Sequence, residues 1–252
     1  MSDDTYDAST YGDRIADVYD DVYTGSPVLA DVATTVGFLA MLAGEGPTLE
    51  LGIGTGRIAI PLAAAGVEVH GIDASQAMVD RFREKPGGSD IPVTMGSFAD
   101  FSLDERFSLI YVVFNTFFAL TSQDEQVTCF HAIARHLALG GAFAMEAFVP
   151  DIARFDRGQR VSAIRVETDA VSIEVSQHDP VEQTTTAQQV VIREDGIRLY
   201  PVRIRFAYVA ELDLMARMAG LRLRERWADW DRSPFTSMSP KHVSVWEHDP
   251  TA

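Results

Sequence analysis

The residues best placed to do chemistry form a glycine-rich turn near position 50. An apolar segment ends in Glu50 and Leu51, and Gly52-Ile53-Gly54-Thr55-Gly56 follows directly before a stretch with a helical pattern. Glycines in a turn between a strand and a helix let the backbone approach a bound ligand closely. The spacing does not fit a dinucleotide-binding fingerprint, whose third glycine is replaced by Arg57, or a phosphate-binding loop, which needs a lysine. The turn therefore predicts a cofactor site of another kind.

A carboxylate follows at the end of the next apolar segment. Asp73 ends the run Gly71-Ile72-Asp73, 21 residues after Gly52. In a three-layer α/β fold this position lies at the carboxyl edge of the neighbouring strand, where a carboxylate accepts hydrogen bonds from both ribose hydroxyls of an adenosine. A lone acid at a strand end is more often a helix N-cap, but the pairing with the glycine turn favours the ribose interpretation. Enzymes that use NAD have the same carboxylate, so the glycine spacing separates the two cofactors.

The glycine turn and Asp73 need a sheet to hold them side by side. Between residues 48 and 141 short apolar runs alternate with helix-like segments, which is typical of βαβ units and a parallel sheet. We expect strands over residues 48–51, 67–72, 91–95, 109–114 and 142–148, and helices over 57–65, 75–84 and 123–137. The last of these helices has an apolar stripe, and His131 and His136 on it are expected to be packed or solvated.

The pattern changes after about residue 160. Four segments of strand-like alternation follow without a helical segment between them, and Asp195-Gly196 marks a hairpin turn. We interpret this block as an antiparallel β lobe inserted after the fifth strand. A helix over residues 211–219 and strands over 221–227 and 242–247 follow. The expected fold is therefore α/β, with a three-layer Rossmann-like sheet and an inserted antiparallel lobe.

Composition and charge narrow the classes of partner. The 252 residues include 21 basic and 37 acidic ones, which gives a net charge of −16. Such a field repels a polyphosphate backbone, so no nucleic-acid partner is expected, and no apolar run is long enough to span a bilayer. Cys129 is the only cysteine, which excludes an intrachain disulfide and a cysteine-based metal site. With an acidic N-terminus where a secretory signal would be basic, these features predict a cytoplasmic protein.

Further motifs follow the glycine turn and Asp73 in a recognisable order. They are Met95-Gly96-Ser97-Phe98-Ala99-Asp100-Phe101 after the third expected strand, Phe114-Asn115-Thr116-Phe117-Phe118 after the fourth, and Leu139-Gly140-Gly141 before the fifth. This series, within about Tyr11 to Glu247, resembles the class I S-adenosylmethionine (SAM) dependent methyltransferases, in which an acidic residue precedes Gly-x-Gly-x-Gly. It looks like the small bacterial N-methyltransferases of antibiotic biosynthesis, which act on deoxyaminosugars, lincosamides or the N-terminus of linaridin peptides.

The resemblance implies SAM as cofactor, S-adenosylhomocysteine as product and no metal ion. In this family the glycine turn holds the amino acid end of SAM, the segment after the third strand meets the adenine, and the segment after the fourth flanks the sulfonium. Ser97 stands where the family usually has an acid that binds the exocyclic amine of adenine, so backbone groups would make that contact. The implied cofactor-binding residues are Tyr19, Glu50, Gly52, Gly54, Gly56, Asp73, Ala74, Ser97, Phe98, Phe114 and Asn115.

The residues expected to act on the acceptor come from three segments. Residues 11–20 resemble the capping helix of the family, in which Tyr11 and Tyr19 would share one face and close over SAM, although tyrosines that only pack on the sheet give the same pattern. Glu146, at the end of a central strand, is a candidate for orienting an amine, with a salt-bridged acid as the alternative. Phe117 is expected to wall the acceptor pocket, with a place in the core as the alternative.

Together these patterns predict a methyltransferase with three parts. Capping helices occupy residues 1–45, the SAM-binding core residues 46–150 and 211–252, and the lobe over the acceptor site residues 151–210. The predicted reaction transfers a methyl group to an amine nitrogen of a small natural product, such as an antibiotic or aminosugar-like intermediate. The alternatives are O-methylation of a small molecule, α-N-methylation of a peptide N-terminus, and a non-catalytic SAM-binding protein. A homo-oligomer is compatible with the sequence.

Overall fold

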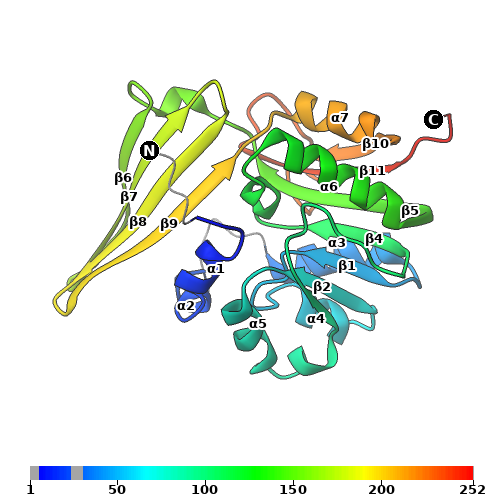
Figure 1. The fold of residues 1–252 in the computed structure, drawn as a ribbon, viewed down its shortest axis with the longest axis horizontal. Helices are drawn as coiled ribbons and strands as arrows, with labels where there is room; N and C mark the ends of the chain where they lie inside the picture. The colour runs from blue at the N-terminus through cyan, green and yellow to red at the C-terminus, as the bar shows by residue number, and fades with distance from the viewer. Residues whose placement is uncertain (1–5, 24–30, 252) are drawn as a thin grey trace.

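A computed structural model describes residues 6–23 and 31–251, which form two β-sheets. Figure 1 shows the larger sheet with helices on both faces, which we call the body, and the smaller sheet projecting beside it, which we call the lobe. Two short helices, α1 (Thr10–Ile15) and α2 (Tyr19–Tyr23), lie in the angle between the body and the lobe.

The sheet of the body has seven strands in the order β10-β11-β5-β4-β1-β2-β3. Strands β1 to β5 run parallel to one another, and β11 is antiparallel to both β5 and β10. The chain order reverses between β1 and β4, and in open α/β sheets ligands bind beyond the carboxyl ends of the strands at such a point. The strands are β1 (Thr48–Leu51), β2 (Val69–Asp73), β3 (Val93–Met95), β4 (Phe107–Val112), β5 (Leu137–Phe148), β10 (Leu221–Trp227) and β11 (Lys241–His248).

Helices cover both faces of this sheet and begin at side-chain caps in several places. Asp31 accepts a hydrogen bond from the Thr34 N–H at the start of α3, and Ser75 accepts one from the Met78 N–H at the start of α5. Ser122 and Glu125 form a capping box before α6. Caps of this kind satisfy the free N–H groups of the first turn. The helices are α3 (Val32–Ala43), α4 (Ala59–Ala64), α5 (Gln76–Arg83), α6 (Gln123–His136) and α7 (Val209–Met218).

Alternate residues of the central strands enter two apolar clusters on opposite faces of the sheet. On β4, Ile110 and Val112 pack in one cluster with α6 and α7, while Leu109 and Tyr111 pack in the other with α3, α4 and α5. Burial on both faces explains why the central strands read as continuous apolar runs. His136 lies within the first layer, where its Nε2 accepts a hydrogen bond from the Leu103 N–H, as expected for a packed histidine.

The lobe is an antiparallel meander of four strands in the order β6-β7-β8-β9. They are β6 (Gln159–Val166), β7 (Ala170–Asp179), β8 (Thr184–Arg193) and β9 (Gly196–Arg205). The hairpin predicted at Asp195-Gly196 is confirmed, because Arg193 pairs with Gly196 across it. The predicted α/β fold class with an inserted antiparallel sheet is likewise confirmed.

The predicted continuous helix over residues 11–20 is wrong. The described chain has a turn at residues 16–18, in which the Val18 N–H bonds to the carbonyl of Ile15 instead of continuing the helical ladder. Asp, Val and Tyr, which make up residues 17–23, are weak helix formers, so the segment breaks into two short helices. Residues 1–5 and 24–30 of the predicted capping region lie outside the described residues.

The described helices include none with the length and apolar character needed to cross a membrane.

Candidate active site

A cavity lies beyond the carboxyl ends of β1 and β2 and under the N-terminal helices. Its walls come from the glycine turn after β1, the segment after β2, the residues after β3 and the short 3-10 helix η2 (Thr116–Ala119) after β4. Because each of these segments follows a parallel strand, the sheet brings them to one edge. Tyr6, Tyr11 and Tyr19 from the N-terminal segment close the cavity on the side away from the sheet.

The three glycines of the turn all adopt left-handed backbone conformations. A side chain at Gly52, where φ is +73°, would place its Cβ 2.4 Å from Cγ2 of Thr116. At Gly56, with φ +78°, a Cβ would lie 2.3 Å from the ring of Phe82. Gly54, with φ +56°, faces open space and lines the cavity. The turn thus needs glycine at two positions for close packing, and at the third its backbone is exposed to a ligand.

Asp73 lies at the end of β2 with its carboxylate on the cavity wall. One oxygen accepts a hydrogen bond from the Gly54 N–H at 2.7 Å, and the other accepts one from the Ser75 N–H at 2.9 Å. Burial raises the pKa of this carboxyl above its ordinary value, against the lowering effect of these N–H donors. The N-cap of α5 is Ser75, so the simple helix-cap interpretation of Asp73 does not hold.

Glu50 lies on a second, smaller cavity behind the glycine turn. Its buried carboxyl accepts a hydrogen bond from the Tyr111 hydroxyl at 3.0 Å, and the cavity wall also includes Tyr19, Arg57 and Phe114. Burial raises the pKa of Glu50 to about 8, even though Tyr111 and Arg57 lower it. A positively charged ammonium group bound in this cavity would favour the ionised form of the Glu50 carboxyl and so lower its pKa.

The tyrosines of the N-terminal helices contact one another above the cavity. The hydroxyls of Tyr11 and Tyr23 are 2.9 Å apart, and the rings of Tyr19 and Tyr23 lie 4.7 Å apart between centroids. Burial raises the pKa of both Tyr11 and Tyr19 above the ordinary tyrosine value. Both hydroxyls are therefore neutral at physiological pH. Tyr11 and Tyr19, predicted on one helix face, line the same cavity although they lie on separate helices.

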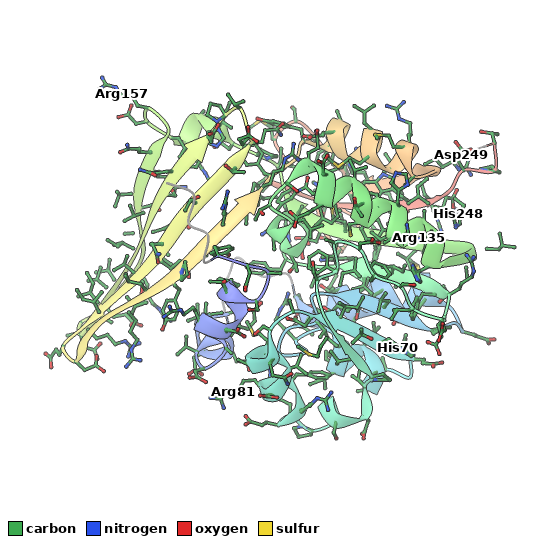
Figure 2. All side chains as sticks on the ribbon, viewed as in Figure 1. His70, Arg81, Arg135, Arg157, His248 and Asp249 are labelled. Atoms are coloured by element: carbon green, nitrogen blue, oxygen red, sulfur yellow. The ribbon has the colours of Figure 1, made fainter. Side chains whose placement is uncertain are left out.

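Acidic residues fasten the N-terminal helices to the body. The Ser75 hydroxyl donates to Asp13 at 2.6 Å, and Arg81, labelled on α5 in Figure 2, donates to Asp17 at 2.7 Å.

The next acidic residue of this segment, Asp20, pairs with Lys85 at 2.7 Å and accepts a hydrogen bond from the Thr55 hydroxyl at 2.8 Å. Since Thr55 belongs to the glycine turn, this turn is in direct contact with α2, and we call helices α1 and α2 together the lid.

The remaining residues predicted for the cofactor divide into two groups. Ala74, Ser97 and Phe98 line the main cavity. Phe114 lines the smaller one, where its ring lies 5.2 Å from that of Tyr23 and 6.0 Å from the Arg57 guanidinium.

Asn115 turns away from both cavities. Its side-chain oxygen accepts a hydrogen bond from the Phe148 N–H at 2.6 Å, which ties the turn after β4 to the end of β5. Asn115 and Phe114 have φ values of +61° and +53°, a left-handed conformation that Asn adopts more readily than bulky residues.

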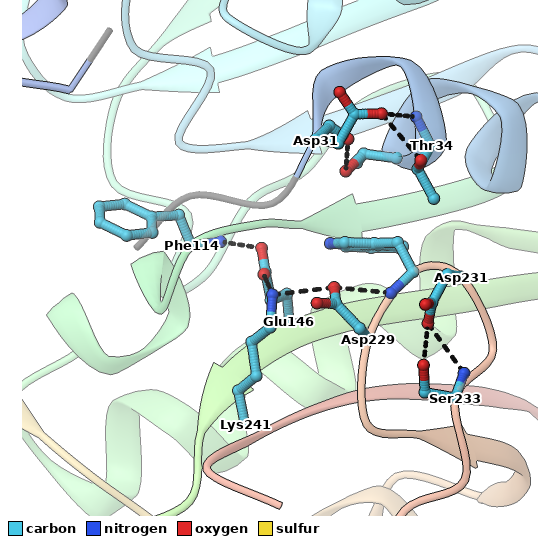
Figure 3. A network of polar contacts seen from close by, with 10 residues as sticks. Asp31, Thr34, Phe114, Glu146, Asp229, Asp231, Ser233 and Lys241 are labelled. Carbon is cyan, nitrogen blue, oxygen red and sulfur yellow. Dashed lines mark hydrogen bonds and ion pairs between the residues drawn. The ribbon is translucent and has the colours of Figure 1, made fainter. Parts of the chain in front are cut away.

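Glu146 belongs to an ion-pair network outside the residues that line the two cavities. Figure 3 shows its carboxylate between the Phe114 N–H, at 3.0 Å, and the Lys241 ammonium, at 3.2 Å. Lys241 also bonds to Asp229 at 2.8 Å. This arrangement is the salt-bridged alternative that the sequence left open.

Phe117 is completely buried in the core of the body. Its ring packs edge-on against Phe130 at 5.4 Å, and the neighbouring Phe118 packs against Phe148 at 5.1 Å. The arrangement matches the core alternative for these aromatics, and Phe117 does not line either cavity.

The sequence interpretation missed several residues of the site. Tyr6 and Thr116 line the main cavity, and Tyr23 bridges Tyr11 and Phe114. The recurrence of tyrosine at 6, 11, 19 and 23 in an otherwise polar, acidic segment was an available signal. The described residues contain no cluster of three or more His, Cys, Asp or Glu side chains placed to hold a metal ion.

Comparison with known proteins identifies the family. A family model described as a methyltransferase domain matches residues 48–141. The structure of the CcbJ methyltransferase from Streptomyces caelestis is 44% identical in sequence and has a TM-score of 0.91, covering 96% of this chain and 99% of that chain. The chain belongs to the SAM-dependent methyltransferase family.

Two more distant relatives are also methyltransferases. The cypemycin N-terminal methyltransferase from a Streptomyces species is 29% identical over 249 residues, covering 96% of this chain and 98% of that protein. The SAM-bound structure of CalS10, an amino pentose methyltransferase from Micromonospora echinaspora, is 21% identical and has a TM-score of 0.66, covering 90% of this chain and 96% of that chain. The cofactor of this methyltransferase is SAM.

Proposed function

We propose that this enzyme transfers a methyl group from SAM to an amine nitrogen of a small natural product. The observation that carries the proposal is the set of ionisable side chains on the wall of the main cavity. Its described lining includes Tyr6, Tyr11 and Tyr19 but no histidine or lysine. Burial raises the pKa of each of these tyrosines, so they are neutral phenols that orient an acceptor but do not remove a tightly held proton.

An amine suits such a cavity better than an aliphatic hydroxyl does. A free amine already carries the lone pair for attack, and its ammonium form, with a pKa of about 8 to 10, is in equilibrium with a fraction of free amine at neutral pH. A hydroxyl holds its proton much more tightly and needs an adjacent base. Asp7, at the cavity mouth, is a poor base, since hydrogen bonds from the side chains of Thr10 and Ser9 lower its pKa.

The chemistry of the cavities fits SAM. When bound, SAM supplies an electrophilic methyl group, and the protein has to align the acceptor with it and exclude water. The exposed backbone at Gly54 and the carboxyl of Glu50 suit the amino acid end of the cofactor, and the carboxylate of Asp73 suits a ribose.

We assign the remaining cofactor contacts by position. Ala74, Ser97 and Phe98 would bind the adenine, and Tyr19 with Phe114 would flank the sulfonium. Gly52 and Gly56 would shape the turn, and Asn115 would hold the conformation that presents Phe114.

We assign the acceptor contacts to Tyr11 and Tyr19. Both phenols line the main cavity, where each would accept a hydrogen bond from the amine or donate one to it. Glu146 would act as a positioning residue, because its carboxylate holds the backbone N–H of Phe114. Phe117 would contribute by supporting η2 from the core.

A peptide α-amine is a second candidate acceptor. The relative that covers nearly the whole chain at 29% identity is described as an N-terminal methyltransferase, whereas CalS10 is described as an amino pentose methyltransferase. Both acceptors are amines, so the proposed chemistry is the same and only the shape of the acceptor differs.

A matched set of acceptors tests the proposal. The enzyme is incubated with SAM and an aminosugar nucleotide, the same sugar nucleotide with a hydroxyl in place of the amine, and a short peptide with a free or acetylated N-terminus. Formation of S-adenosylhomocysteine with a free amine, and not with its hydroxyl or acetylated partner, is expected. Turnover of the hydroxyl compound alone would contradict the proposal.

We also propose a role for each part of the chain and a cellular compartment for the enzyme. Residues 1–45 would act as a cap, residues 46–150 and 211–252 as the cofactor-binding core, and residues 151–210 as a lobe over the acceptor. The net charge of −16 supports a small-molecule or peptide acceptor over a nucleic acid. We place the enzyme in the cytoplasm, where the single, buried Cys129 stays reduced.

A further inference from the structure

The last strand of the lobe ends in a buried arginine. Figure 1 shows β9 running from the tip of the lobe to the body, where α6 and α7 lie. Arg205, the final residue of β9, is only 5% exposed. Its guanidinium donates to the side-chain oxygen of Gln126 on α6 at 2.7 Å and to the carboxylate of Glu211 on α7 at 2.7 Å. One side chain thus joins the lobe to two helices of the body.

The contact with Glu211 is an ion pair. Burial raises the pKa of the Glu211 carboxyl. Hydrogen bonds from Arg205, Gln183 and Gln123 outweigh this effect, so that the pKa lies below its ordinary value and the group is charged at neutral pH. Burying charges costs free energy, and apolar side chains of similar volume stabilise a fold as well or better. What this pair does fix is the geometry at the end of β9.

Gln126 connects Arg205 with the wall of the main cavity. Its side-chain nitrogen donates to the backbone carbonyl of Arg205 at 2.7 Å and to the backbone carbonyl of Leu120 at 3.1 Å. Gln126 is completely buried, and its amide oxygen and nitrogen are both used in these contacts. Leu120 directly follows η2 and lines the main cavity together with Ala119. The end of β9 is therefore tied to this part of the wall.

The same stretch of β9 holds a second part of the wall. The backbone N–H of Arg203, two residues before Arg205, donates to the Tyr6 hydroxyl at 3.1 Å. Tyr6 also lines the main cavity. Tyr6 and Leu120 come from distant parts of the sequence, yet both are fastened to residues 203–205.

We propose that Arg205 is a positioning residue, which sets the acceptor side of the main cavity through Leu120 and Tyr6. The inference rests on the proposed function, in which the segments after β1, β2 and β3 bind SAM. The rest of the wall comes mainly from the N-terminal residues and η2, and it is this part to which β9 is tied. A displaced β9 should therefore alter acceptor binding and leave SAM binding as it is.

A substitution that keeps the charge isolates the geometric role. Arg205→Lys still offers a cation to Glu211 but lacks the planar fork that reaches Gln126 at the same time. Arg222→Lys is the matched control, because Arg222 of β10 forms an exposed ion pair with Glu247 and should tolerate the same change.

Hydrogen exchange of the full chain, followed by mass spectrometry, tests the proposal without an acceptor. In Arg205→Lys the backbone N–H groups of residues 116–120 and 6–11 should exchange at least about fivefold faster than in the wild type, because local opening no longer breaks the Arg205 contact. Residues 52–56 of the glycine turn should exchange at the wild-type rate. The control Arg222→Lys should leave all three segments unchanged.

Steady-state kinetics separate positioning from a general loss of structure. The acceptor is whichever of the aminosugar nucleotide and the short free peptide the wild type methylates. Arg205→Lys should raise the KM of this amine about tenfold, the effect of losing one hydrogen bond to a charged group. The dissociation constant of SAM should stay within about twofold, and kcat within about threefold, of the wild-type value. A purely structural defect would weaken SAM and amine binding alike.

Two outcomes would overturn the proposal: wild-type exchange at residues 116–120 and 6–11 in a folded Arg205→Lys, or a loss of SAM affinity as large as that of the amine. A wild type that methylates no amine would contradict the proposed function, while the exchange rates would still decide the role of Arg205. Far-UV circular dichroism verifies folding. If Arg205→Lys does not fold, Gln126→Glu replaces it and must give the same pattern, since it keeps an acceptor for Arg205 and removes the donors to both carbonyls.

Discussion

The sheet of the body and the sheet of the lobe use apolar side chains in different ways. On β4 of the body, neighbouring residues enter clusters on opposite faces, so both faces are covered by helices. On the strands of the lobe, one face packs partly on the N-terminal helices and the other presents Val161, Val166 and Ile197 to solvent. The body thus covers its apolar side chains within one chain, while the lobe leaves part of its own exposed to solvent.

The largest expected difference between the body and the lobe is in the free energy of unfolding lost when an apolar side chain is truncated. Phe130→Ala removes a ring that contacts Phe117, Phe143 and Trp246, and it should lower the free energy of unfolding by about 3–5 kcal/mol. Val181→Ala, in a loop of the lobe where Val181 is 84% exposed, should change it by less than about 0.5 kcal/mol. Urea denaturation measures both values. Equal losses for the two variants would show that the lobe is as tightly packed as the body.

The next largest expected difference is in SAM affinity, which a substitution in the body should lower and one in the lobe should not. Asp73→Ala removes a carboxylate from the cavity wall and should weaken SAM binding at least about 100-fold, because two hydrogen bonds to a charged group contribute about 3 kcal/mol or more. Glu174→Ala, in the lobe, should leave the dissociation constant of SAM within about twofold of the wild-type value, because Glu174 does not line the cavity. Isothermal titration calorimetry compares them. Unchanged SAM affinity in Asp73→Ala would remove Asp73 from the cofactor site.

Acidic side chains in the two regions should respond oppositely to pH. Burial raises the pKa of Glu50 to about 8 from an ordinary value of 4.5. Its contribution to stability is therefore complete below pH 4.5 and is lost as the pH rises through 8. Without SAM, the wild type should lose on the order of 2 kcal/mol of unfolding free energy between pH 6 and pH 9, and Glu50→Gln should lose less.

In the lobe, Asp179 provides the contrast. Backbone N–H donors of Glu182 and Val181 lower its pKa below 3.8. Its contribution is present above that pH and is lost as the pH falls through the lowered value, the reverse of Glu50. Urea titrations of the wild type and Glu50→Gln between pH 6 and pH 9, and of the wild type and Asp179→Asn from about pH 5 down to about pH 2, give the two slopes. A wild-type slope that Glu50→Gln does not alter would show that Glu50 is already ionised in the apoprotein.

The smallest effect concerns the contact between the lid and α5. Arg81→Ala removes an exposed pair with Asp17 and should change the free energy of unfolding by less than about 0.5 kcal/mol and the KM for SAM by less than about threefold. Steady-state kinetics with a productive amine measure the KM. A larger rise would mean that the lid depends on this one pair, whereas Ser75 and Lys85 offer two others.

The alternation of apolar and polar residues and the turn residues predicted several strands and one hairpin of the fold. The strands expected over residues 48–51 and 221–227 coincide with β1 and β10, and the hairpin at Asp195-Gly196 formed where its turn residues indicated. The glycine turn was recognisable because positive φ at three close positions leaves little choice of residue.

Contacts between distant parts of the chain could not be predicted in the same way. Glu146 was identified as an acid at a strand end, but its partner Lys241 lies 95 residues later on a strand whose register the sequence does not reveal. Tyr6 accepts a hydrogen bond from the Arg203 N–H of β9, a contact that depends on how the lobe folds back over the N-terminal segment. The α1–α2 turn, by contrast, could have been predicted from the sequence, because the Asp, Val and Tyr residues at 17–23 are weak helix formers.

Ser75 connects the carboxylate of Asp73 with the lid. Its N–H bonds to Asp73, its hydroxyl donates to Asp13 of the lid, and a Cβ at Gly12 would come within 2.5 Å of its own Cβ. One residue therefore contacts both the lid and the carboxylate that we propose binds the ribose of SAM. Because coupling free energies are reciprocal, whatever factor the docked lid adds to SAM affinity, SAM must add to the docking of the lid. Order in the N-terminal helices and cofactor occupancy then rise together as a single equilibrium.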